Sequence, residues 1–304
     1  GGAEMHSKIS GVSDYLAEDE LDGIRIAREL MEIVKTTTPQ LIPSDEVEAP
    51  KHHPDELLGV VPADPKTPVD VREVILRACD GSRFSEFKPE YGNTMVCGWG
   101  KIHGYPIGIV ANNGVIFSES ANKGAQFIQL SNKNDIPLLF IQNTTGYMVG
   151  KAYEEGGIIK NGAKLINAVS NSKVPSITLM IGSSFGAGNY GMNGRSYDPN
   201  FLFTYPNAKI GVMGSEQLAG VMNIIQRASA KAAGIPFDEE NAKVIQQMLI
   251  NEAESKASAW HSTSELWDDG VIDPRETRNY LGFALAILYN QKIKGANEYG
   301  VWRM

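Results

Sequence analysis

Two glycine-bearing segments hold the residues of this sequence that are best suited to chemistry. Residues 143–150 (NTTGYMVG) and 182–192 (GSSFGAGNYGM) each follow a short apolar run directly. Segments of this kind present backbone N–H groups, and two such groups that converge on one oxygen form an oxyanion hole. The alternative interpretation is that the glycines only permit tight turns and close packing. Because two such segments follow two such runs, the sequence favours a backbone anion site.

Ser184 offers a second kind of chemistry. Residues 182–186 (GSSFG) match the G-x-S-x-G pattern of a hydrolase nucleophile that follows a strand. A serine hydrolase also needs an acid and then a histidine downstream, and His261 is the only histidine there. This hypothesis stays open behind the first. Residues 186–191 match G-x-G-x-x-G, but they lie mid-chain without an acidic residue after the next strand, so we do not expect a dinucleotide site.

Metal and redox chemistry have little support in the sequence. His52 and His53 stand in a proline-rich stretch, where an accidental exposed pair is the better interpretation. The chain has 2 cysteines, Cys79 and Cys97, whose spacing matches neither a zinc motif nor a disulfide framework. We therefore expect no metal and a reducing compartment.

The hydrophobic pattern predicts the elements that must position the two segments. Short continuous apolar runs predict buried strands, and apolar residues at helical spacing predict the helices between them. Alternating strands and helices with short connections predict an α/β fold with a mostly parallel sheet. The expected helices are 13–37, 71–79, 118–133, 157–172, a short one at 187–192, 215–233 and most of 238–290. The expected strands are 94–102, 106–111, 136–142, 174–181, 201–205 and 209–213.

Composition narrows the classes of partner. The 304 residues carry a formal net charge of −8, which argues against a nucleic-acid groove spread over the chain. No apolar run approaches the length of about 18 residues that a membrane span needs. Residues 280–289 (YLGFALAILY) are too apolar to face water, so we expect an assembly of subunits rather than a monomer.

Several runs, in the same order, give the chain a specific resemblance. It resembles the carboxyltransferase (β) subunits of biotin-dependent acyl-CoA carboxylases, above all those of the methylcrotonoyl-CoA carboxylases. The runs that carry the resemblance are FIQNTTGYMVG (140–150), IGSSFGAGNYGM (181–192), DVREVI (70–75), DGSRF (80–84), NNGV (112–115), WDDGVIDP (267–274) and GVWRM (300–304).

The resemblance implies a crotonase-like (ClpP/crotonase) ββα superhelix. It covers the second half of the family's usual length, so residues 1–37 would be the helical end of an N-terminal carboxyltransferase half. Residues 38–70 would be a proline-rich linker, and residues 71–304 a C-terminal crotonase-like carboxyltransferase domain. The first half would carry most of the coenzyme A site, which leaves the biotin-facing side to this chain.

The resemblance also assigns roles to individual residues. The backbone N–H groups of Ala187 and Gly188 would form the oxyanion hole for the ureido oxygen of biotin. The other assigned residues are Gly146, Tyr147, Phe185 and Gly186 for biotin, Asn189 and Tyr190 for the acyl chain, and Arg83 and Lys88 within a segment 83–113 for acyl-CoA contact. Ordinary aromatic packing is the alternative for both tyrosines, and surface charge the alternative for Arg83 and Lys88. The chain departs from the family pattern at Asn193, where the resemblance leads us to expect a cysteine, and at Tyr147, where phenylalanine is commoner; both leave the acyl substrate open.

The resemblance implies transfer of a carboxyl group from carboxybiotin to an acyl-CoA, such as 3-methylcrotonoyl-CoA, in leucine, fatty-acid or propionate metabolism. Biotin would be carried by a separate carrier domain or biotin carboxylase α subunit, because the chain lacks a Met-Lys-Met biotinylation motif. A homo-oligomer is implied, in the cytoplasm of a bacterium or the mitochondrial matrix of a eukaryote. Two alternatives stay open: a crotonase-like hydratase or decarboxylase using Glu119, Glu154 or Glu155 as its acid, and a non-catalytic assembly half.

Overall fold

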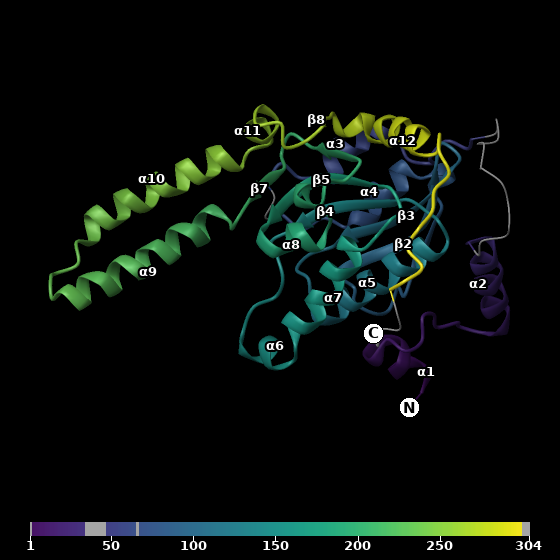
Figure 1. Cartoon of the computed structure of the whole chain (residues 1–304), viewed down its shortest axis with the longest axis horizontal. Helices are drawn as coiled ribbons and strands as arrows, with labels where there is room; N and C mark the ends of the chain where they lie inside the picture. Colours follow the sequence, from purple (N-terminus) through teal and green to yellow (C-terminus); the bar gives the residue numbers. More distant parts are fainter. Residues whose placement is uncertain (1, 34–46, 65–66, 300–304) are drawn as a thin grey trace.

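A mixed sheet of eight strands runs through the centre of the molecule (Figure 1). The computed structural model describes residues 2–33, 47–64 and 67–299. The strand order is β1-β2-β3-β4-β5-β6-β8, and β7 pairs with the end of β5. Strands β1 to β3 pair antiparallel, whereas every pairing from β3 onward is parallel, which confirms the expected mostly parallel sheet. The strands are Phe84–Phe87 (β1), Met95–Ile102 (β2), Tyr105–Asn112 (β3), Leu138–Thr144 (β4), Ser176–Phe185 (β5), Phe201–Thr204 (β6), Lys209–Gly211 (β7) and Gly270–Val271 (β8).

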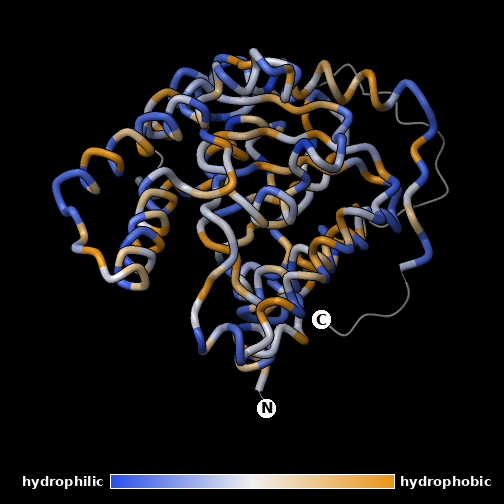
Figure 2. Tube along the Cα trace, turned by 60° about the vertical axis from the view of Figure 1, so that its left-hand side comes forward, coloured by the Kyte–Doolittle hydropathy of each residue, from blue (hydrophilic) through white to orange (hydrophobic). Residues whose placement is uncertain are grey.

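Helices cover both faces of this sheet. Helices α4 (Val71–Ala78) and α12 (Thr277–Leu288) pack on one face, and α5 (Ser118–Lys133) and α7 (Ile158–Ser170) pack on the other. Successive strand residues point to opposite faces, so Leu139 and Ile141 join the first layer while Leu138 and Phe140 join the second. Figure 2 shows hydrophobic residues throughout the body of the molecule and along the helices that project from it.

Most predicted elements lie where the pattern places them. Helices α5 and α9 (Ser215–Ala233) begin and end at the predicted residues. Asp70 caps helix α4, because its carboxylate accepts a hydrogen bond from the Arg72 N–H. The remaining helices are α1 (Ala3–Met5), which continues into a π-helix (His6–Ser10), α2 (Glu20–Ile33), α3 (Leu57–Val60), α6 (Lys151–Glu155), α8 (Gly186–Gly191), α10 (Glu239–Ala257) and α11 (Ala259–Ser264).

The amino-terminal part differs from the prediction of one helix over 13–37. Helix α2 begins only at Glu20, because Asp19 caps it by accepting a hydrogen bond from the Asp22 N–H at 2.8 Å. Before it, Tyr15 packs edge-on against Phe87 of β1 and holds the chain in a non-helical path. Residues 34–37 of the predicted helix, residues 38–46 and 65–66 of the predicted linker, and the run 300–304 lie outside the described residues.

One more prediction needs correction, and two elements were not predicted. The proline-rich stretch contains α3, whose Leu57 is buried in the layer beside α4. Strand β5 does not end at residue 181 but continues to Phe185, because residues 183–185 pair with β7. The sequence does not predict strand β1, because its four residues FSEF lie between turns and are too few to show an alternating pattern.

Helices α9 and α10 form a hairpin that projects from the body of the molecule (Figure 1). Ion pairing between Glu254 and Lys209, together with a hydrogen bond from Ser215 to Glu254, anchors its base. Along its length several apolar side chains are exposed, among them Ile224, Ile235 and Met248, with 62–67% of their surface open. The apolar run 280–289 lies mostly in α12, where Leu281, Ala284, Leu285 and Leu288 cover the sheet of the same chain. Its other large apolar residues, Tyr280, Phe283 and Ile287, are 42–67% exposed and stay available for contact with another subunit.

Candidate functional site

The two glycine-bearing segments meet at one edge of the sheet. They follow β4 and β5, which are parallel neighbours and therefore end at the same edge. A side chain on Gly188 would lie 2.9 Å from the Cα atom of Gly146, so the backbones of the two segments touch at these glycines. The sequence prediction that both segments form one site is consistent with this contact.

Gly186, the first residue of α8, lies where only glycine fits. Its φ of +52° lies in the left-handed region, and a Cβ atom there would come within 2.8 Å of the Val212 carbonyl oxygen. Val212 follows β7 and is 82% exposed, so it forms an apolar rim beside the amino end of α8. The sequence does not predict that Val212 lies beside Gly186, because this proximity depends on the pairing of β7 with β5.

The amino end of α8 is the part of this site that can bind an anion. The N–H groups in the first turn of a helix have no acceptor within the helix, and no side chain of the preceding residue caps this one. Ala187 is exposed whereas Gly188 is buried against Gly146, so the end of the helix opens toward solvent on one side. No residue of 143–150 or 182–192 carries a formal charge, which leaves backbone dipoles as the groups that can stabilise negative charge here.

Gly146 contributes its shape rather than a free donor. Its φ of +130° again requires glycine, and its N–H donates to Thr144 Oγ1 at 3.1 Å. The carbonyl of Gly146 accepts from the Ile116 N–H, and the Met148 N–H donates to the Ile116 carbonyl. The first segment is thus fixed on both sides, and it offers a rigid wall to the end of α8.

The two tyrosines assigned to this site lie differently. Burial raises the pKa of Tyr147, whose ring fits against Gly162 of α7 and Gly191 of α8, so its side chain packs inside the fold. The side chain of Tyr190 is 47% exposed and meets the ring of Tyr197 edge-on at 5.9 Å. Of the two, Tyr190 has the accessible ring.

The side chains of Phe185 and Asn189 both point into the protein. The Phe185 ring is 8% exposed and lies against Gly211 of β7. Asn189 donates to Ser184 Oγ at 2.8 Å and is 7% exposed. Any contact of these two residues with a ligand would run through their backbone, and their assignment to biotin and to the acyl chain stays a prediction.

The serine hydrolase hypothesis is wrong for Ser184. This residue lies inside β5 rather than on a turn, it is fully buried, and its hydroxyl donates to Gln142 Oε1 at 2.5 Å. A nucleophile elbow needs an exposed hydroxyl beside a histidine. His261 instead lies on α11 and packs against Trp267.

The carboxylates considered for a hydratase or decarboxylase are also poorly placed. Glu119, Glu154 and Glu155 are all exposed, at the start of α5 and along α6. Glu155 lies 3.8 Å from Lys151, an exposed surface pair. None of the three is buried in a cleft where a general acid could meet a bound thioester.

The residues assigned to acyl-CoA contact lie around the edge strand β1. Three strand spacings separate β1 from β4, or roughly 14 Å. Arg83 is exposed and pairs with Glu48. Lys88 is 3% exposed, donates to the Gly11 carbonyl and pairs with Asp14 at 2.8 Å. The structure thus gives both cations partners within the chain, and it does not bring them to the glycine segments.

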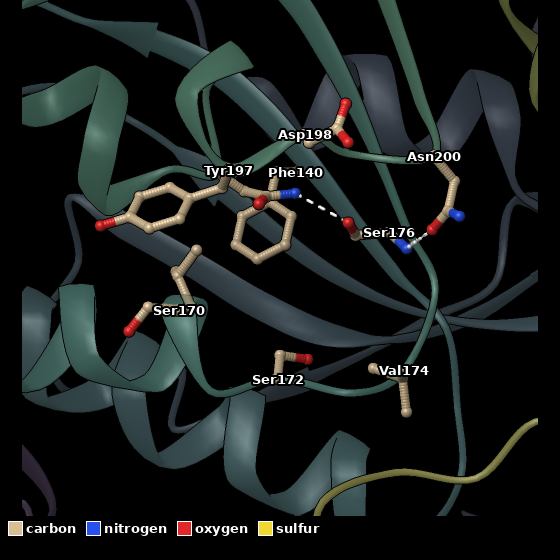
Figure 3. Close-up of a pocket in the computed structure, with 10 residues that line it drawn as sticks. Phe140, Ser170, Ser172, Val174, Ser176, Tyr197, Asp198 and Asn200 are labelled. Carbon is tan, nitrogen blue, oxygen red and sulfur yellow. Dashed lines mark hydrogen bonds between the residues drawn. The ribbon is translucent and has the colours of Figure 1, made fainter.

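A cavity of about 180 Å³ lies elsewhere, between the end of α7 and the beginning of β5 (Figure 3). Figure 3 shows Ser176 at its wall, where the hydroxyl accepts from Asn193 and the N–H donates to Asn200. Because Ser176 starts β5 and Gly186 follows its end, this cavity lies toward the opposite edge of the sheet from α8. It is not part of the candidate site.

Residues 2–33, 47–64 and 67–299 hold neither a metal-binding cluster nor a membrane-spanning helix. They contain no group of three or more His, Cys, Asp or Glu side chains able to hold a metal ion. None of their helices is both long and apolar enough to cross a bilayer.

Comparison with known proteins places this geometry in a family. The model of the carboxyl transferase domain matches residues 1–300. The chain belongs to the carboxyl transferase family. The 3-methylcrotonyl-coenzyme A carboxylase β1 subunit of Mycobacterium tuberculosis, named as biotin-dependent, is 47% identical over 304 residues, which are 100% of this chain and 57% of that protein.

Solved carboxyl transferases share the fold. The geranyl-CoA carboxylase β subunit of P. aeruginosa superposes with a TM-score of 0.76 at 42% identity, over 100% of this chain and 58% of that one. The transcarboxylase 12S hexamer, solved with hydrolysed methylmalonyl-coenzyme A, superposes with a TM-score of 0.84 at 28% identity, over 99% of this chain and 58% of that one. The expected crotonase-like α/β fold is confirmed, and the chain spans a little over half the length of these relatives.

Proposed function

We propose that this chain supplies the biotin-facing half of a site that transfers a carboxyl group from carboxybiotin to an acyl-CoA. The observation that carries the proposal is the contact of Gly188 with Gly146, which sets the open amino end of α8 against a fixed wall. The N–H groups of Ala187 and Gly188 would hold the ureido oxygen. One such donor is typically worth about 2.7–4 kcal/mol in a transition state.

The residues present fit a neutral ureido group. Their donors are backbone N–H groups, neither 143–150 nor 182–192 holds a charged side chain, and Val212 offers an apolar surface beside them. When bound, carboxybiotin supplies the carboxyl group, and its ureido nitrogen can take the proton that the acyl-CoA loses. This chain then needs no general base, in agreement with the exposed or remote positions of Glu119, Glu154 and His261. Its own residues orient the ureido group and stabilise charge on its oxygen.

For the acyl group we propose 3-methylcrotonoyl-CoA or a related branched acyl-CoA. The support is that a relative named for 3-methylcrotonyl-CoA is 47% identical to this chain, and a relative named for geranyl-CoA is 42% identical to it. Both names denote thioesters with a methyl branch at carbon 3. Tyr190, with its accessible ring, is the better of the two predicted residues to contact that chain.

The partners would be an acyl-CoA, a biotin-carrying subunit and further copies of the chain. Exposed apolar residues along α9 and α10, and the hexamer of the related transcarboxylase, support an oligomer. We also propose the division into 1–37, 38–70 and 71–304, which is supported by the seven prolines of residues 38–70. The compartment would be the cytoplasm in a bacterium or the mitochondrial matrix in a eukaryote.

A transfer assay tests the proposal. The whole enzyme, with its biotin-carrying subunit, is given labelled bicarbonate, ATP and a panel of acyl-CoA thioesters. We expect label in the carboxylated product with 3-methylcrotonoyl-CoA or geranyl-CoA, and much less with acetyl-CoA. Hydration of an enoyl-CoA in the absence of biotin would favour the hydratase alternative, and no turnover in a correctly assembled enzyme would favour the assembly role.

A further inference from the structure

A buried network of hydrogen bonds joins α8 to the two central strands. Ser184 of β5 donates to Gln142 Oε1 of β4 at 2.5 Å and accepts from Asn189 Nδ2 of α8 at 2.8 Å. Gln142 Nε2 donates to the carbonyl of Met192, directly after α8, at 2.6 Å. Gln142 and Ser184 are fully buried and Asn189 is 7% exposed, so water does not replace these bonds.

We infer that Gln142, Ser184 and Asn189 are positioning residues that fix α8 where its N–H groups can act. The network grips the helix at Asn189 and again just after its end, and ties both points to strands that cannot move separately. Asn189 follows Gly188 directly, so the bonds of its side chain restrain the backbone that carries the proposed donors. This inference rests on the proposed function, because it assigns the network to the oxyanion site.

Helix α8 needs such support from outside. It has six residues, GAGNYG, and half of them are glycine, so the isolated segment would hardly be helical. Apolar neighbours on the same face, such as Phe140 of β4 and Met180 of β5, show that hydrophobic side chains could fill this space. Directional bonds hold a short helix in one register, whereas apolar contacts alone allow it to shift.

Gly194 closes the network from the other side. Its N–H donates to the Asn189 carbonyl at 2.8 Å, and a Cβ atom on Gly194 would come within 1.9 Å of Asn189 Oδ1. The φ of Gly194 is −68°, so alanine is conformationally allowed there. Gly194→Ala would therefore expel the Asn189 amide without removing any atom of the network.

Two variants and a control test the inference in the whole enzyme. Ser184→Ala breaks the network at its centre, and Gly194→Ala displaces Asn189. Tyr205→Phe is the control, because it also removes a fully buried 2.5 Å side-chain hydrogen bond, to Thr277, on the other face of the sheet. Hydrogen exchange of the amides of 190–192 reports on α8, and carboxyl transfer to free biotin reports on the site.

We expect exchange at 190–192 to become at least about tenfold faster in both variants, with kcat and kcat/KM for biotin falling together by about 10–100-fold. KM for the acyl-CoA should change less than about twofold, and Tyr205→Phe should leave exchange at 190–192 and transfer unchanged. Variants that behave like Tyr205→Phe in both measurements would overturn the inference. If Ser184→Ala is fully active while Ala187→Pro is inactive, the positioning role is wrong but the proposed function stands. If Ala187→Pro is also active, the proposed function is wrong.

Discussion

Replacing Gly188 by alanine tests the contact on which the candidate site depends. The new Cβ atom would lie 2.9 Å from the Cα of Gly146 and 2.9 Å from Cγ2 of Thr144, half an ångström short of an ordinary 3.4 Å contact. Because Gly146 presents backbone, the two segments must separate by about this amount. A misplacement of about 1 Å can cost 10²-fold in rate, so we expect kcat for carboxyl transfer to fall by about 10–100-fold.

The same substitution should cost little stability. Alanine is about 1 kcal/mol better than glycine inside a helix, and overpacking typically costs about 1–3 kcal/mol, so the net loss should stay below about 2 kcal/mol. Gly23→Ala in α2 is the matched control, because its Cβ would meet only Ala17 at 3.7 Å. It should raise stability slightly and leave transfer to free biotin, assayed in the whole enzyme, unchanged. A folded Gly188→Ala enzyme with the kcat of the wild type would refute the reasoning.

Three further predictions follow from individual groups. Ala187→Pro removes one proposed donor, so carboxyl transfer in a folded variant should fall at least about 10²-fold, and retained activity would show that this N–H is not used. Burial, and then the charge of Arg278, lower the pKa of His103, so the unfolded chain binds more protons than the folded one. The free energy of unfolding should therefore fall as the pH drops below about 6.5. Urea unfolding at two pH values should show a smaller fall for His103→Asn, which tolerates the same φ of +50°, and an equal fall would count against this role of His103. Burial raises the pKa of Cys79 and of Cys97 to about 12, so both thiols should resist alkylation at pH 8 until the protein is unfolded, and rapid labelling of the native protein would contradict their burial.

Much of the fold could be predicted because its strands and helices carry strong local signals. The run IPLLFIQ is apolar without interruption, since β4 is covered on both faces, and α5 shows helical spacing from its first residue to its last. The shared site of the two glycine segments could be predicted because each follows a buried run, and parallel strands end at one edge of a sheet. In these cases the local pattern and the tertiary environment agree.

The details of the site could not be predicted because they depend on tertiary pairing. Residues 183–185 look like part of a loop, yet their pairing with β7 makes them the end of strand β5. That pairing buries Ser184, which turns an apparent nucleophile into a hydrogen-bonding group. The polar side chain of Asn189, next to Tyr190, is of a type usually found at the surface. Its amide instead donates to Ser184 and Gln142 inside the protein. Only the three-dimensional arrangement separates these roles.

The most direct test of the central claim is a crystal structure of the protein with biotin or a biotinyl-lysine peptide. The account predicts that the ureido oxygen lies about 2.7–3.1 Å from the backbone nitrogens of Ala187 and Gly188, beside Gly146 and Val212. Biotin bound elsewhere, for example in the cavity at Ser176, with the amino end of α8 free, would contradict it.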